Sequence, residues 1–305
     1  MSRVLDYNAS TKAFIASATQ TISFTSSDVP SDRVLRYIFQ VNSTGGTAWT
    51  LATIDRIRVK ANGVAIFDLS FAQLRAYLFR FCRGGYTTPQ AAITSSGGVA
   101  QNTQRFTIPF FILDAPTKND ADVCQFPMNS NVTIEITMTT AAAVTGTVVC
   151  GYEQTDIPAQ CYPKLLSGPM SIGASAASGR HNLSEDGIVE GFGINSVGLL
   201  RAKLVLAGRQ VLHAAGQVAN DADAFDANTS SMLWESQQLD CPWSTSSAGT
   251  AYADTVPNDP IFVDVHAGLN APPGASYLEL QTGASWGGIA NEVCVYSVVP
   301  YGRAA

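Results

Sequence analysis

Short runs of apolar and β-branched residues, separated by Gly, Pro, Asn and Ser, recur along almost the whole chain. Runs of this length bounded by turn residues are typical of an all-β sandwich or barrel. Residues 132–138 alternate strictly between apolar and polar side chains, so this strand should have one buried face and one face in water. We expect strands at 21–24, 34–41, 54–59, 65–69, 105–113, 132–138 and 147–152, and again at 187–194, 199–206, 210–212, 261–265, 277–281 and 293–299.

One helix is expected to interrupt this pattern after Ser70. Ser70 and Gln73 have the spacing of a capping box, and Gly84 and Gly85 supply a stop signal. An apolar stripe at helical spacing should pack on the sheet of its own domain. The stripe consists of Phe71, Leu74, Leu78 and Phe81. The fold class is therefore all-β with short helical insertions.

Similar segments occur in both halves of the chain at a nearly constant offset. Residues 149–152 (VCGY) match 293–296 (VCVY), and 134–136 (IEI) match 278–280 (LEL), both at an offset of 144. Because the matches agree in order and spacing, they indicate a tandem duplication of one β-sandwich. About 145 residues per copy suits an eight-stranded jelly roll.

Turn and proline positions extend this repeat. Gly63 and Gly208 each follow an alternating strand, and Pro109 and Pro260 each precede an apolar pair. A stretch rich in Gly, Ser, Ala and Pro separates the halves, as an interdomain connection would. We expect an N-terminal arm at 1–19, a first jelly roll at 20–162, a linker at 163–187 and a second jelly roll at 188–305.

Composition limits the classes of partner. Only 14% of residues are charged, below the usual value of about 25%, so much of the surface must be neutral. The net charge is −6 and basic residues form no run, which argues against nucleic-acid coating. The N-terminal residues lack the apolar stretch of a signal peptide, so we expect synthesis in the cytoplasm. The six scattered cysteines are then expected to be reduced and mostly buried.

Three segments give the chain its resemblance to a known family. They are RVLRYIFQVN at 33–42, IDRIRVKANGVAIFDLSFAQLRAYLF at 54–79 and RFTIPFFILD at 105–114, together with the repeated strand ends. In order and spacing the sequence resembles the double jelly-roll major capsid proteins of tailless, membrane-containing icosahedral bacteriophages, such as corticoviruses and tectiviruses. The resemblance implies a structural protein of the virion that forms homotrimers, which tile an icosahedral shell as pseudo-hexagonal capsomers.

The resemblance also implies particular partners. These are neighbouring capsomers, minor capsid and vertex proteins and, at the periphery, an internal viral membrane, without specific binding of nucleic acid. The loops at 86–103 and 241–259 are expected to face outward, and the arm at 1–19 to clamp neighbouring copies. The main alternative is a carbohydrate-binding jelly roll, either a lectin or a viral spike protein. A hydrolase or lyase acting on glycans is a third class.

The sequence offers few groups for catalysis. None of its three histidines lies in a metal-binding array, and no nucleophile elbow or phosphate-binding loop occurs, so we expect no enzyme and no cofactor. One acidic cluster, Asp221, Asp223 and Asp226, has the dense oxygen ligands that calcium prefers but lacks the EF-hand pattern. A solvated loop is the favoured interpretation of this cluster, and a structural calcium site is the alternative.

Overall fold

The computed structural model describes residues 3–44, 54–71, 73, 74, 77, 78, 102–111, 122–140, 144–172, 178–195, 199–215, 260–282 and 289–301. The chain divides into two compact units. The first unit comprises Met1–Pro163 and Pro300–Gly302, and the second comprises Lys164–Val299 and Arg303–Ala305.

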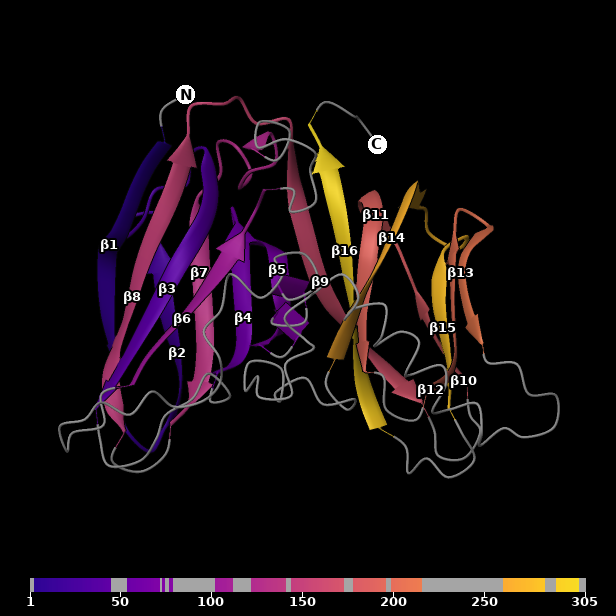
Figure 1. Ribbon diagram of the computed structural model, residues 1–305, viewed down its shortest axis with the longest axis horizontal. Helices are drawn as coiled ribbons and strands as arrows, with labels where there is room; N and C mark the ends of the chain where they lie inside the picture. The colour runs from indigo at the N-terminus through magenta and orange to yellow at the C-terminus, as the bar shows by residue number, and fades with distance from the viewer. Residues whose placement is uncertain are drawn as a thin grey trace, which may run out of the picture. The chain divides into compact units, whose positions relative to one another are not determined.

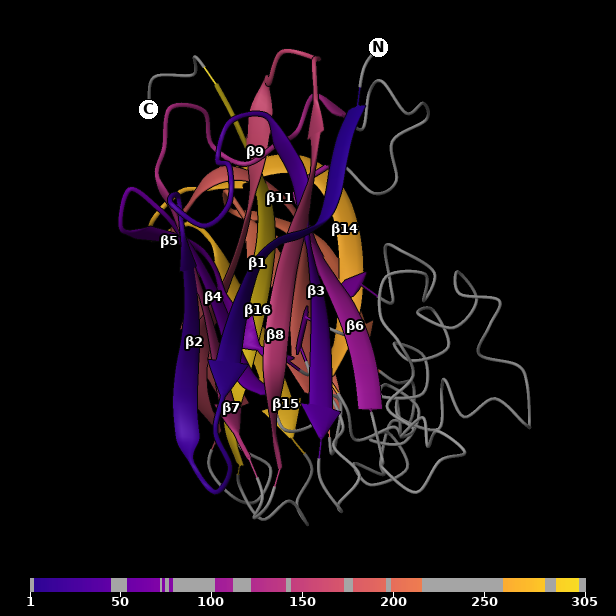
Figure 2. The same ribbon diagram turned by 90° about the vertical axis from the view of Figure 1, so that its left-hand side faces the viewer.

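The first unit is a jelly roll. One sheet has the strand order β1-β8-β3-β6, seen side by side in Figure 2, and the other has the order β2-β7-β4-β5. Counted from one to eight, these orders are 1-8-3-6 and 2-7-4-5, the two four-stranded sheets of a jelly roll. The described strands are β1 (Arg3–Phe14), β2 (Thr19–Thr25), β3 (Val34–Thr44), β4 (Ile54–Ala61), β5 (Val64–Ser70), β6 (Asn102–Pro109), β7 (Val132–Thr139) and β8 (Thr145–Thr155) (Figure 1).

The second unit repeats this topology. Its sheets have the orders β9-β16-β11-β14 and β10-β15-β12-β13, which are again 1-8-3-6 and 2-7-4-5. The predicted pair of tandem eight-stranded jelly rolls is therefore confirmed for the strands that the structure describes. These strands are β9 (Cys161–Ile172), β10 (Ser178–Asn182), β11 (Glu185–Asn195), β12 (Leu199–Leu206), β13 (Arg209–Ala215), β14 (Pro260–Ala271), β15 (Tyr277–Thr282) and β16 (Ile289–Pro300).

Aromatic rings fill the core of the first unit and connect its two sheets. Phe24 of β2 contacts Phe39 of β3 with ring centroids 6.0 Å apart, and Phe39 stacks on Phe106 of β6 at 4.9 Å. Phe67 of β5 meets Phe110 at 5.4 Å. All five side chains are fully buried, and such pairs add about 0.5–1.5 kcal/mol each beyond the burial of their area.

Aliphatic side chains dominate the described core of the second unit. Its largest members come from both sheets, so the same topology encloses a different packing. The cluster contains Met170, Leu183, Val189, Phe192, Leu204, Leu206, Ala271, Leu278, Leu280, Val293 and Val295.

The predicted repeat is confirmed at three places. Cys150 and Cys294 both lie on the eighth strand of their unit, and Glu135 and Glu279 both lie on the seventh. The third place is the hairpin turn between the fourth and fifth strands, described next.

The two hairpin turns have the same backbone conformation. Asn62 and Gly63 have φ values of 49° and 84°, and Ala207 and Gly208 have values of 49° and 76°. Positive φ at both central residues defines the turn that matches the twist of paired strands. Glycine bears this conformation without strain, which explains its presence in both copies.

The helix start was predicted correctly. The amide of Gln73 donates to Ser70 Oγ at 3.2 Å, and the amide of Ser70 donates to Gln73 Oε1 at 3.3 Å, which is a complete capping box. Phe71, Leu74 and Leu78 are helical and buried, and Phe71 meets Phe106 of β6 edge-on at 5.2 Å. The stripe thus packs on its own domain, while Phe81 and the two glycines lie outside the described residues.

The predicted arm and linker differ from the elements in the structure. Most of the predicted arm, residues 1–19, is the edge strand β1, and the predicted linker, 163–187, contains most of β9 and all of β10. Neither region shows a clear apolar alternation, so its sequence does not predict strands. Main-chain pairing with β8 and β15 holds β1 and β10 in place. The division between the units nevertheless falls between Pro163 and Lys164.

The predicted match between two prolines is wrong. Pro109 is the last residue of β6, whereas Pro260 is the first residue of β14, so they lie at opposite ends of equivalent strands. Proline lacks an amide hydrogen and is tolerated at either end of a strand, which produced a coincidental match.

Candidate assembly surface

The acidic cluster with calcium binding as its alternative interpretation, Asp221, Asp223 and Asp226, lies outside the described residues, as do most of the two predicted outward loops. Within the described ranges, no three His, Cys, Asp or Glu side chains lie close enough together to hold a metal ion. The same ranges contain no helix with the length and apolar character needed to cross a membrane.

The edge strand β1 exposes an unusual number of apolar side chains. Val4, Leu5 and Tyr7 are 53%, 43% and 64% exposed, and Ile15, just beyond the strand, is 63% exposed. In the described sheet β1 pairs only with β8, so its outer edge carries main-chain groups available for further pairing. Soluble proteins usually protect such edges, and an exposed apolar edge marks a surface for association.

A close main-chain contact fixes the path of β1. The register with β8 shifts between Asp6 and Ser10, which is a bulge. Opposite it, a Cβ atom added to Gly151 would lie 2.3 Å from the carbonyl oxygen of Asp6 and 2.7 Å from Cα of Tyr7. Glycine is therefore required at 151 for β1 to lie against β8.

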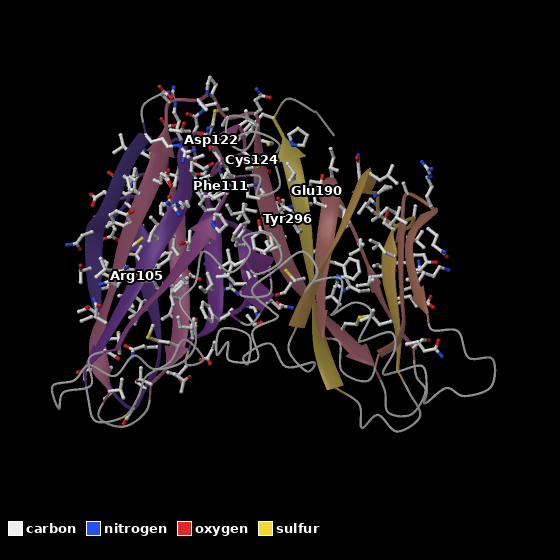
Figure 3. The ribbon with its side chains drawn as sticks, viewed as in Figure 1. Arg105, Phe111, Asp122, Cys124, Glu190 and Tyr296 are labelled. Carbon is white, nitrogen blue, oxygen red and sulfur yellow. The ribbon has the colours of Figure 1, made fainter. Side chains whose placement is uncertain are left out.

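A cluster of four charged side chains holds the start of β1. Arg3 Nη1 lies 2.6 Å from Glu153 Oε1, and Arg3 Nη2 lies 2.7 Å from Asp122 Oδ1. Arg36 Nε of β3 contacts the second oxygen of Glu153 at 2.5 Å. Both carboxylates are buried, and Asp122 is labelled in Figure 3. Although burial lowers it, the pKa of Arg3 is raised overall by its hydrogen bonds and charge interactions with Asp122 and Glu153.

A second charged contact holds the other end of β1. Lys12 Nζ lies 2.7 Å from Asp28 Oδ1, and Ser10 Oγ donates to the same oxygen at 3.2 Å. The amide of Thr25 donates to Asp28 Oδ2 at 2.9 Å. The hydrogen bond from Lys12 is the main cause that lowers the pKa of Asp28 below its usual value, against burial, which raises it.

The solvent face of β7 is polar and internally paired. Thr21 and Thr137 share a hydrogen bond of 3.1 Å across β2 and β7. From β4, the other strand paired with β7, Lys60 Nζ lies 2.6 Å from Glu135 Oε1, and Arg58 Nη1 lies 3.6 Å from Glu135 Oε2. This face has few apolar groups to offer a partner, in contrast to β1.

Tyr301, the last described residue, belongs to the first unit and packs against residues 128 and 160–162 of the same unit. The amide of Tyr301 donates to the carbonyl of Gln160 at 2.7 Å, and its hydroxyl accepts from the amide of Met128 at 2.8 Å. Its ring centroid lies 5.6 Å from that of Tyr162. Burial raises the pKa of Tyr301 to about 12.

Sequence reasoning missed these contacts because their partners are far apart in the chain. Arg3 lies 119 positions from Asp122 and 150 from Glu153, and Met128 lies 173 positions from Tyr301. No local spacing predicts such pairs. The one available signal was the isolated glycine at 151 inside a strand pattern, which indicates a close main-chain approach.

No protein-family model and no curated protein matches the sequence. Solved structures do match. The major capsid protein P2 from Bacteriophage PM2 is 11% identical and superposes with a TM-score of 0.58, covering 99% of this chain and 99% of its own. The capsid of PBCV-1 virus is 11% identical with a TM-score of 0.51, covering 98% of this chain and 92% of its own. The chain therefore has the double jelly-roll fold of these capsid proteins.

Proposed function

We propose that the chain is a major capsid protein, a structural component of a virion shell. The observation that carries the proposal is the presence of two jelly rolls with identical strand order in one chain. The likeness in fold to capsid proteins over nearly the whole chain supports it. The role is structural and needs no catalytic step.

The duplicated fold gives a reason for trimers. Three chains, each with two similar domains, present six similar units around a threefold axis. Such a trimer is a pseudo-hexagonal capsomer that can tile an icosahedral shell. Because the cores differ, with aromatic side chains in the first unit and aliphatic ones in the second, the sixfold symmetry is approximate.

The apolar edge of β1 is the surface that we assign to contact with another copy of the chain. Val4, Leu5 and Tyr7 are exposed there, and a shell protein must bury such groups between copies. Charged contacts hold both ends of β1, so the strand presents a fixed surface.

Further partners follow from the same proposal. They are neighbouring capsomers, minor capsid and vertex proteins and, at the periphery, an internal viral membrane, with no specific nucleic-acid binding. The protein is made in the host cytoplasm and resides in the virion.

Light scattering of the purified chain tests the proposal directly. We expect a particle of about three times the monomer mass of 32.2 kDa, and capsomers or shell fragments by electron microscopy. A monomer that stays monomeric at high concentration and binds a glycan array would instead support the lectin alternative.

A pair of matched variants tests the β1 surface. Val4→Asp introduces a charge at the proposed contact and should shift the trimer toward monomer. Val64→Asp introduces the same charge at another exposed valine, 67% exposed, and should leave the trimer intact. Circular dichroism of both variants checks that the fold is retained. Equal effects of the two changes would refute the assignment of β1.

A further inference from the structure

Two cysteines from distant parts of the chain lie side by side in the first unit. Cys124 and Cys161 form an isolated parallel β-bridge, closed by hydrogen bonds from Gln125 N to Cys161 O at 3.0 Å and from Cys161 N to Val123 O at 3.3 Å. Cys161 Sγ also lies 4.0 Å from the carbonyl oxygen of Val123, the residue before Cys124. Both cysteines are buried thiols that form no disulfide in the structure.

The backbone around the pair has the spacing that a disulfide requires. Paired residues of adjacent strands lie about 5 Å apart, within the range of about 4.4–6.8 Å found between the Cα atoms of bridged cysteines. Residues paired across a β-bridge project their side chains to the same face, so the two thiols lie on one side of the bridge. The backbone spacing is therefore compatible with a disulfide.

The loop that carries Cys124 is held firmly in place. The side-chain amide of Gln125 donates to the carbonyls of Asp122 and Ile157 at 2.7 and 2.8 Å, and the amide of Phe126 donates to Val34 O at 2.9 Å. These bonds keep Cys124 opposite Cys161. Preorganisation of this kind favours bond formation between the two sulfur atoms over reaction with other thiols.

The two thiols differ in ways that assign their roles. Cys161 is 7% exposed and Cys124 is not exposed at all. The neighbouring Cys124 lowers the pKa of Cys161, while burial raises the pKa of Cys124 well above its usual value. Because the thiolate is the nucleophile in exchange reactions, Cys161 is the group that meets an oxidant first.

We propose that Cys124 and Cys161 are a site of reversible disulfide modification, formed by exchange with a small-molecule disulfide such as oxidised glutathione. The thiolate of Cys161 attacks one sulfur of oxidised glutathione, the S–S bond breaks, and one glutathione leaves. Cys124 then attacks the Cys161 sulfur and gives up its proton, and the second glutathione leaves. The two cysteines lose two electrons, and oxidised glutathione is reduced to two thiols that take up both protons.

The modification would join covalently two segments that hydrogen bonds hold together in the fold. Cys124 lies in the segment before β7, and Cys161 is the first residue of β9, the strand on which the chain passes into the second unit. The bond would fix the exit of the chain from the first jelly roll. This inference depends on the thiol pair and stands apart from the proposed function.

Peptide mapping of the folded, full-length protein after exposure to oxidised glutathione tests the site. We expect one dominant crosslinked peptide that joins Cys124 to Cys161, with the loss of two hydrogens in the intact mass, and full reversal by dithiothreitol. Cys150→Ala, which removes a buried thiol on β8, is the matched control and should keep the crosslink.

Single variants test the order of attack. In Cys124→Ser the mixed disulfide cannot resolve, so one glutathione should remain on Cys161. Cys161→Ser should take up glutathione at Cys124 at least tenfold more slowly, because that thiol is buried. If the folded wild-type protein forms no bond between Cys124 and Cys161 after exhaustive oxidation, or if the two variants react at equal rates, the proposal fails. The wild-type mapping decides the matter even if a variant does not fold.

Discussion

Glu135 in β7 and Glu279 in β15 occupy the same position in their two jelly rolls, each directly across from a basic residue of the fourth strand. Arg58 of β4 lies opposite Glu135, and Lys203 of β12 lies opposite Glu279. Both basic residues precede the first left-handed turn residue by four positions. The duplication therefore extends to the placement of opposite charges across the two strands, and in the first unit Arg58 Nη1 lies 3.6 Å from Glu135 Oε2.

Ala207→Asn should stabilise the second unit. Ala207 has a φ of 49°, which costs an ordinary residue about 1–2 kcal/mol, whereas asparagine tolerates this conformation and is the residue found at the equivalent position 62. We expect a gain of about 0.5–1 kcal/mol in the free energy of unfolding, measured by urea denaturation. Asn62→Ala is the reciprocal change and should destabilise the first unit, since Asn62 Oδ1 also accepts from the amide of Asn131 at 2.8 Å.

Gly151→Ala should displace β1. The added methyl group would overlap the main chain at Asp6, and main-chain atoms cannot move aside as a flexible side chain can. We expect a loss of about 1–3 kcal/mol in unfolding free energy, as for other overpacked sites. Hydrogen exchange should accelerate along β1 and remain unchanged along β7. Unaltered exchange along β1 would show that the strand does not depend on this contact.

Glu153→Gln should destabilise the first unit, because it removes the charge shared by Arg3 and Arg36. Both guanidinium groups are partly exposed, so we expect about 2 kcal/mol rather than the larger cost of a fully buried pair. Asp32→Asn is the matched control. Asp32 is 73% exposed and lies 3.9 Å from Arg33, so its loss should cost less than about 0.5 kcal/mol. Denaturant unfolding of both variants makes the comparison.

Asp28→Asn should change how stability depends on pH. The pKa of Asp28 is lowered in the folded protein, so its ionised form contributes stability above its unfolded pKa of about 3.8. That contribution is lost as pH falls through the folded pKa. The variant should be less stable than wild type at pH 7, and the difference should shrink as pH falls below about 4.

Unfolding midpoints in urea at several pH values measure this difference. Lys12→Gln removes the principal partner of Asp28 and should reduce the same pH-dependent difference. Parallel stability curves for wild type and Asp28→Asn would show that this carboxylate does not gain stability on folding.

Local patterns predicted the elements that local forces determine. Residues 132–138 alternate because one face of β7 is buried, and Ser70 with Gln73 begins a helix because their side chains satisfy its first amides. The turn glycines at 63 and 208 were recognised because only a few residues accept positive φ. The fold class followed from these elements taken together.

Elements held by distant partners were not predictable in this way. β10 has the sequence SGRHN and owes its strand conformation to pairing with β15. The sequence predicts an arm in place of β1, because these residues show no regular apolar alternation and the paired strand β8 is distant in the chain. The ion cluster around Arg3 and the thiol pair Cys124 and Cys161 likewise depend on contacts that only the folded chain brings together.

The hydrogen bond from Tyr301 to Gln160 makes the second jelly roll a segment whose two ends meet. The chain leaves the first unit after Pro163 and returns to it at Pro300, so the residues between form a closed excursion from one point. A segment of this kind can be exchanged for another domain, or shortened to a brief connector, without stretching the remainder of the chain. Both points at which this segment is attached, Pro163 and Pro300, belong to the first unit.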